Sequence, residues 1–174
     1  MRSAQNIYLK PYSTDDFDHY YKLVKEERVM YYITGRSETF AEATANYNQI
    51  IAYNHMHNDR TGYYQLYVET SYVGFGKLSW DDNHRLEIGY MILPAFWRQG
   101  YAKQCIQLLL ELAQNSSIKT NEIIAIIDPE NKVSKHLLTT FGFISVWKGI
   151  EAGLSSEHLS LKIPNFLKDT TQPN

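Results

Sequence analysis

The stretch Glu87–Ala102 holds the residues with the clearest chemical potential in this chain. Its sequence, EIGYMILPAFWRQGYA, predicts an apolar strand that ends at Pro94, then a short loop, and then a helix that begins near Gly100. The first backbone N–H groups of a helix lack partners and carry the positive end of its dipole, so they attract anions. Gly100 lets a ligand approach the backbone, and Arg98 and Lys103 add positive charge. This loop therefore predicts a site for phosphate or pyrophosphate.

The same loop also fits a simpler interpretation. It lacks the Gly-Lys-Ser/Thr sequence of a P-loop and the third glycine of a dinucleotide-binding fingerprint. An ordinary strand-to-helix turn with a glycine at a tight position would use the same residues. Taken alone, the loop leaves both interpretations open.

A second segment begins with the sequence NKVS at residues 131–134 and ends with the pair Gly142-Phe143. Its apolar residues recur at helical spacing, and Gly142 is a natural residue to end a helix. By residue type alone, Asn131 is a good N-cap and Ser134 is an ordinary residue of the first turn. The segment predicts a short helix after the apolar run at 123–127.

Together, the two segments resemble the GNAT family of N-acetyltransferases. The first is similar to that family's cofactor motif, a strand ending in Xaa-Pro followed by Arg/Gln-Xaa-Xaa-Gly-Xaa-Gly/Ala, and the second to its Asn-Xaa-Xaa-Ser/Ala…Gly-Phe helix. The Glu87-Ile-Gly-Tyr opening and Trp97 resemble the Rim-type branch, which contains the ribosomal-protein N-terminal acetyltransferases. The order of expected elements is compatible with the family from Ile7 to Leu161.

The resemblance implies an acetyl-CoA-dependent N-acetyltransferase, in which a primary amine attacks the thioester directly in a ternary complex. The acceptor would be a protein N-terminus or a small amine, and acetyl-CoA would be the co-substrate, with no metal. The cofactor-binding residues would be those that match the motifs, namely Met91, Ile92, Trp97, Arg98, Gln99, Gly100, Tyr101, Ala102, Asn131 and Ser134. The backbone of Met91 and Ile92 would pair with the pantetheine arm, and the N–H groups of residues 98–102 would hold the pyrophosphate.

The resemblance also implies two catalytic side chains. Glu87 is similar to the family's candidate base, which takes a proton from the acceptor ammonium; the alternative is an exposed strand residue paired with Arg85 or another base. The thiolate is often protonated in this family by a tyrosine four residues before the Gly-Phe pair, but this chain has Leu138 there. That departure makes Ser134, one helical turn earlier, the candidate acid.

Two other functions remain open at this point. A non-catalytic acyl-CoA sensor or interaction module would explain the missing tyrosine at position 138. A transferase for another acyl group, such as succinyl or propionyl, would use the same motifs. Cofactor binding without turnover would identify the first, and competition between acyl-CoA species would identify the second.

The elements that must position these segments follow from periodicity. Strands are expected near residues 7–9, 63–68, 72–80, 86–93, 123–127, 143–147 and 158–161, and helices near 14–24, 39–57, 100–114 and 131–141. Antiparallel hairpins followed by strand–helix–strand units predict an α+β domain with a mixed, mostly antiparallel central sheet flanked by helices. The resemblance adds the GNAT fold, in which splayed strands form the acyl-CoA slot.

Length and composition limit the remaining classes. The 174 residues suit one domain, which we expect over residues 1–167 with a flexible tail at 168–174. A formal charge of −2 gives no overall positive charge that would attract nucleic acid. No apolar run approaches the roughly 18 residues of a membrane span, and no signal peptide is evident, so a cytoplasmic location is expected.

The remaining reactive residue types suggest structural roles. Cys105, the single cysteine, lies on the apolar face of an expected helix and is predicted to be a buried structural thiol. The six histidines show no metal-binding spacing. Of the 14 tyrosines, those in the first third (Tyr31, Tyr32, Tyr47, Tyr53, Tyr63 and Tyr64) could line an acceptor groove, as the resemblance implies, although most are expected to cover the sheet. The oligomeric state is expected to be a monomer or a homodimer.

Overall fold

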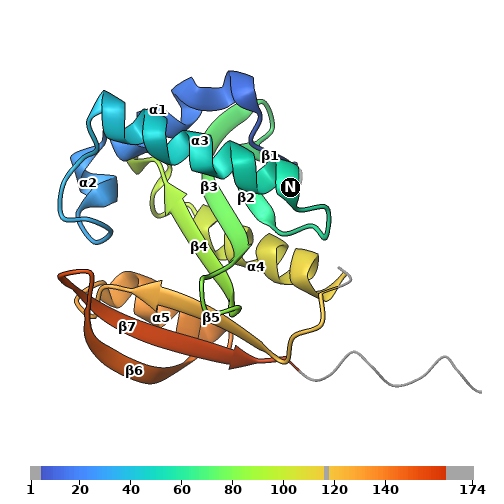
Figure 1. Ribbon diagram of the computed structural model, residues 1–174, viewed down its shortest axis with the longest axis vertical. Coiled ribbons are helices and arrows are strands. Elements are labelled where there is room, and N and C mark those ends of the chain that lie inside the picture. The colour runs from blue at the N-terminus through green and yellow to red at the C-terminus, as the bar shows by residue number, and fades with distance from the viewer. Residues whose placement is uncertain (1–4, 116–117, 164–174) are drawn as a thin grey trace, which may run out of the picture.

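The computed structural model describes residues 5–115 and 118–163, so the tail predicted at 168–174 lies outside the described residues. Within them, seven strands form one sheet in the order β1-β2-β3-β4-β5-β7-β6 (Figure 1). Every neighbouring pair is antiparallel except β4 and β5, which run parallel. The sequence-based prediction of an α+β fold with a mixed, mostly antiparallel sheet is confirmed.

The elements lie close to the positions predicted from periodicity. The strands are β1 (Ile7–Pro11), β2 (Gly62–Val68), β3 (Ser71–Trp80), β4 (Leu86–Ile92), β5 (Glu122–Ile127), β6 (Ile144–Glu151) and β7 (Leu154–Lys162). The helices are α1 (Phe17–Val24), α2 (Glu27–Met30), α3 (Phe40–Met56), α4 (Tyr101–Gln114) and α5 (Lys132–Thr140), with 3-10 turns η1 (Thr14–Asp16) and η2 (Pro94–Phe96). Helix α2 was not predicted, and β6 and β7 are longer than the sequence pattern indicated.

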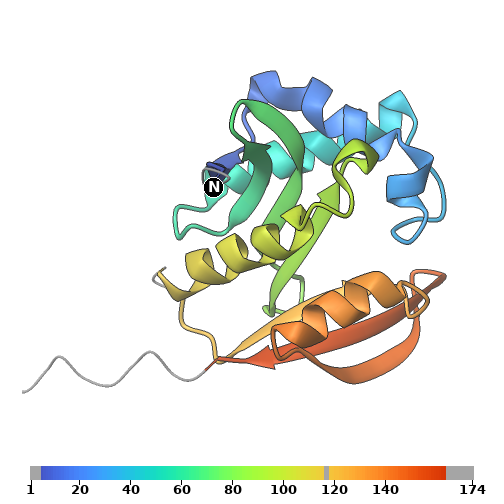
Figure 2. The ribbon, with the colours of Figure 1, turned by 180° about the vertical axis from the view of Figure 1, so that it is seen from behind.

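Helices cover both faces of the sheet. Helices α1 and α3 lie on one face of β1–β4, and α4 lies on the other, with α5 on that same second face over β5 and β7 (Figures 1 and 2). Two apolar cores result, one under α4 and α5 and one under α1 and α3. The second core contains Tyr12, Tyr20, Tyr47 and Tyr72, so these tyrosines cover the sheet rather than line an open groove.

The central feature of the sheet is the separation of β4 from β5. Their parallel pairing joins residues 86–88 to residues 123–125 and stops there, although β4 continues to Ile92 and β5 to Ile127. Along its other edge, β4 stays paired with β3 as far as Ile92. Figure 1 shows the two strands diverging beyond their paired ends. This is the splayed pair of strands that the resemblance predicted.

Candidate functional site

The backbone of β4 is open toward β5 beyond the last paired residue. The N–H of Leu93 donates to the carbonyl of Val73 in β3, and alternate residues of a strand turn their backbone groups to opposite edges. Tyr90 and Ile92 therefore turn their backbone groups toward the gap. Met91 turns toward β3, where a Cβ on Gly74 would stand 2.2 Å from the Met91 oxygen. Of the two predicted backbone contacts, the structure thus directs Ile92 into the gap and Met91 away from it.

The loop before α4 presents backbone donors that no protein group uses. Arg98 (φ 61°) and Gly100 (φ 84°) both adopt the left-handed conformation, and Gly100 is the N-cap of α4. Among the residues that the structure describes, the N–H groups of residues 98–103 have no acceptor. By contrast, the side chains of Thr39 and Asn131 cap α3 and α5. Only α4 of these three helices keeps its N-terminus free for an anion.

Trp97 ties this loop to the end of β4. Its indole Nε1–H donates to the Ile92 carbonyl at 2.7 Å. The guanidinium carbon of Arg28, in α2, lies 5.9 Å from the centre of the Trp97 ring, within cation–π range. The indole therefore positions the loop relative to the open edge of β4 and occupies the Ile92 carbonyl, which leaves the Ile92 N–H for a ligand.

The other predicted residues of this loop differ in what their side chains do. Arg98 and Gln99 are exposed, and the Gln99 amide donates to the Ala95 carbonyl at 3.1 Å. The Tyr101 ring is buried in the core under α4, and its hydroxyl donates to Gln5 at 3.2 Å. Tyr101 and Ala102 can therefore offer a ligand their backbone N–H groups.

On the far side of the gap, the start of α5 contains two predicted site residues, Asn131 and Ser134. The Asn131 side-chain oxygen accepts from the Ser134 N–H at 3.1 Å, which confirms Asn131 as the N-cap. The Ser134 hydroxyl lies 2.6 Å from the hydroxyl of Tyr90, which reaches across from β4. Burial raises the pKa of Tyr90 above its usual value. Leu138 is 1% exposed and packs in the core, away from any role in proton transfer.

The candidate base, Glu87, lies near the start of β4. Its carboxylate forms an ion pair with Lys77 of β3 at 2.7 Å, and the two side chains are 13% and 24% exposed. The alternative of pairing with a base other than Arg85 is therefore the one observed, and Arg85 itself bonds Asp81 at 2.8 Å. A Cβ on Gly89 would stand 3.0 Å from the Lys77 side chain that crosses it, so a larger residue there would push the lysine side chain aside.

The candidate base and the hydroxyl pair occupy opposite faces of the sheet. Side chains alternate along a strand, so Glu87 and Met91 share one face while Tyr90 projects from the other. Met91 packs with the aromatic core under α1 and α3, and Tyr90 packs with the core under α4. The Glu87 carboxylate, ion-paired with Lys77, therefore lies on one face of the sheet and the two hydroxyls lie on the other.

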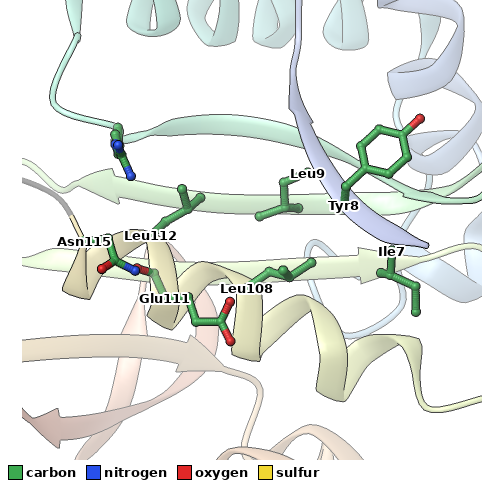
Figure 3. A pocket seen from close by; sticks show the side chains of 8 residues that line it. Ile7, Tyr8, Leu9, Leu108, Glu111, Leu112 and Asn115 are labelled. Carbon is green, nitrogen blue, oxygen red and sulfur yellow. The ribbon is translucent and has the colours of Figure 1, made fainter. Parts of the chain in front are cut away.

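Other reactive groups lie away from the gap. Cys105 is fully buried, as predicted, and burial raises the pKa of its thiol to about 12. Within residues 5–115 and 118–163, no group of three or more histidine, cysteine or acidic side chains could hold a metal ion. Nor does any helix of that part combine the length and apolar character of a membrane span. The hollow in Figure 3, between β1 and the end of α4, contains none of the predicted site residues.

The sequence matches the acetyltransferase (GNAT) domain family over residues 6–144. The chain therefore belongs to this family of acetyltransferases, and its fold is the GNAT fold. It is similar to the uncharacterized N-acetyltransferase YoaA of Bacillus subtilis, with 34% identity over 71 residues that cover 41% of this chain and 39% of that protein. The match thus spans less than half of that relative's length.

Solved structures share the fold across most of the chain. An acetyltransferase from Agrobacterium tumefaciens gives a TM-score of 0.76 at 14% identity and covers 94% of each chain. The spermidine N-acetyltransferase of Vibrio cholerae, solved with CoA and spermine, gives a TM-score of 0.70 at 19% identity and covers 90% of this chain and 95% of that one. At these identities the likeness establishes the architecture.

Proposed function

We propose that the protein is an acetyl-CoA-dependent N-acetyltransferase whose cofactor lies between β4 and β5. The observation that carries this proposal is the early end of the β4–β5 pairing at Ile88, next to the free N-terminus of α4. A solved relative with the same fold binds CoA, which supports the choice of ligand.

The cofactor would use backbone groups from both sides of the gap. The N–H groups of residues 98–102 would hold the pyrophosphate, because they lack protein acceptors and Gly100 leaves open space beside them. The pantetheine arm would run along the edge of β4 at Tyr90 and Ile92. The side-chain amide of Asn131, whose oxygen already caps α5, would donate to the same arm.

The reaction would be direct transfer. The acceptor amine, deprotonated through Glu87, attacks the thioester carbonyl, the C–S bond breaks, and CoA leaves as a thiol. A backbone N–H at the end of β4 would stabilise the developing oxyanion. Ser134, on the opposite face from Glu87, is the candidate acid for the departing sulfur.

The acceptor is a primary amine in this proposal, either a protein N-terminus, as in the Rim-type branch, or a small amine. Placement of the catalytic domain at residues 1–167, a cytoplasmic location and a monomeric or homodimeric state belong to the same proposal. A polyamine is one amine to test, because the Vibrio cholerae relative was solved with spermine.

A calorimetric titration of the protein with acetyl-CoA, CoA and ATP tests the cofactor. We expect binding of acetyl-CoA and CoA in preference to ATP, followed by thiol release when peptides, polyamines and amino sugars are screened as acceptors. Binding of neither CoA species to folded protein would contradict the proposal. Cofactor binding without thiol release on any amine would support a non-catalytic sensor. Faster thiol release from succinyl-CoA or propionyl-CoA would mean that the protein transfers that acyl group rather than acetyl.

A further inference from the structure

The hydroxyls of Tyr90, in β4, and Ser134, in α5, lie 2.6 Å apart and form a pair that joins these two elements. We infer that this pair stabilises the departing CoA thiolate, with Ser134 donating a hydrogen bond to sulfur and Tyr90 holding and polarising Ser134. This inference rests on the proposed function and narrows the role of Ser134 within it. Tyr90 acts through Ser134 and is therefore a positioning residue.

The position of Tyr90 makes it suitable for this role. It lies two residues beyond Ile88, the last residue of β4 that pairs with β5, so its side chain starts inside the gap. The ring packs against the core under α4, which fixes its direction, and its hydroxyl meets Ser134 at 2.6 Å. The position that often supplies a tyrosine in the family is filled by Leu138, which is buried. The phenol thus reaches the first turn of α5 from β4 instead.

The chemistry of the two hydroxyls sets the direction of their hydrogen bond. Each hydroxyl has one hydrogen to donate and can accept through its oxygen. A phenol is more acidic than an aliphatic alcohol, so Tyr90 is the better donor and Ser134 the better acceptor. With its oxygen engaged by Tyr90, Ser134 keeps its own hydrogen free for another acceptor. A hydrogen bond received by Ser134 also strengthens the one that it donates.

No proton needs to leave either hydroxyl. When the tetrahedral intermediate collapses, the C–S bond breaks and its electron pair stays on sulfur. Ser134 stabilises that thiolate by a charge-assisted hydrogen bond. The raised pKa of Tyr90 keeps the phenol protonated throughout. The proton from the amine leaves through Glu87 to water, and CoA takes a proton from water, so atoms and charges balance.

The thiol pKa of bound CoA tests this inference without an identified acceptor. The ultraviolet absorbance of the thiolate is followed against pH in the CoA complexes of the wild-type protein and variants. A donor to the thiolate lowers the thiol pKa, so we expect Ser134→Ala to raise it by about one unit, given the strength of hydrogen bonds to charged groups. Tyr90→Phe should raise it in the same direction, and the double variant should match Ser134→Ala alone.

Tyr64→Phe is the matched control. Tyr64 is a tyrosine of the same core, and its hydroxyl donates to the Arg60 carbonyl, away from the gap. We expect its CoA complex to keep the wild-type thiol pKa. If Tyr90→Phe also keeps it, or if the two single effects add in the double variant, the inference is wrong. If the wild-type protein fails to bind CoA, both the proposed function and this inference are wrong.

Discussion

Replacement of Gly100 by alanine tests the anion site at the N-terminus of α4. Gly100 has a positive φ of 84°, and a Cβ there would have no protein atom within 4 Å. The added methyl group would therefore disturb only the backbone conformation and whatever ligand occupies the open space. Gly153, in the turn between β6 and β7, has the same two properties with a φ of 80°. Gly153→Ala is thus a matched control for the backbone effect.

The expected magnitudes follow from these positions. A residue with a Cβ costs about 1–2 kcal/mol in the left-handed conformation, so both variants should lose a similar amount of stability. In Gly100→Ala the methyl group would also displace the pyrophosphate from at least one N–H donor. A hydrogen bond to a charged group contributes about 1.5–3 kcal/mol, which corresponds to a loss of roughly tenfold or more in affinity.

Thermal unfolding and calorimetric titration with CoA separate the two effects. We expect both variants to unfold at lower temperature than the wild-type protein, and only Gly100→Ala to bind CoA more weakly. Gly100→Glu, which adds a negative charge to the same space, should abolish CoA binding. Equal CoA affinity in Gly100→Ala and Gly153→Ala would refute the placement of the pyrophosphate.

Three further predictions concern single side chains. Glu87→Gln should lower kcat severalfold on an identified acceptor, by removing the base, while calorimetry shows nearly unchanged acetyl-CoA affinity; a wild-type rate and pH profile would remove Glu87 as the base. Cys105 should react with a thiol reagent in native protein only as fast as the protein unfolds, since it is buried and its thiol pKa is about 12; rapid native labelling would contradict this. Hydrogen bonds from Arg36, then from Thr39, lower the pKa of Glu42 to about 2, against about 4.3 in unfolded chains. Ionised Glu42 therefore stabilises the fold at pH values above about 4.3, and this stabilisation is lost as the pH falls toward 2. The difference in Tm between wild type and Glu42→Gln should shrink over this pH range. A constant difference in Tm would contradict the lowered pKa of Glu42.

Local signals in the sequence were sufficient to predict most of the helices and strands. The helical spacing of apolar residues from Phe40 onward predicted α3, and Pro94 and Gly100 marked the end of β4 and the start of α4. The lengths of β6 and β7 were missed because β6 is exposed along nearly its whole length and β7 begins exposed, so their residues show no regular alternation of apolar and polar types. Helix α2 was missed because four residues are too few to show a helical period.

The site was predictable where it depends on backbone and motif, and less so where it depends on contacts between distant segments. The spacing at residues 98–102 predicted a strand-to-helix loop, and the family resemblance was needed to favour an anion site over an ordinary turn. The partner of Glu87 is Lys77, ten residues away across a strand pair, whereas the sequence could suggest only the nearby Arg85 or an unnamed base. The bond between Tyr90 and Ser134 joins residues 44 positions apart and depends on how α5 packs over the gap. The period-2 pattern of β4 could have indicated that Tyr90 faces α5.

Hydrogen–deuterium exchange with and without acetyl-CoA tests whether the cofactor lies between β4 and β5. We predict slower exchange in the complex for the amides of Tyr90 and Ile92, which face the gap, and for those of residues 98–103, which lack protein acceptors. The amides that surround the hollow of Figure 3 should keep their rates. Saturating acetyl-CoA that leaves Tyr90, Ile92 and residues 98–103 unprotected would show that the cofactor lies elsewhere.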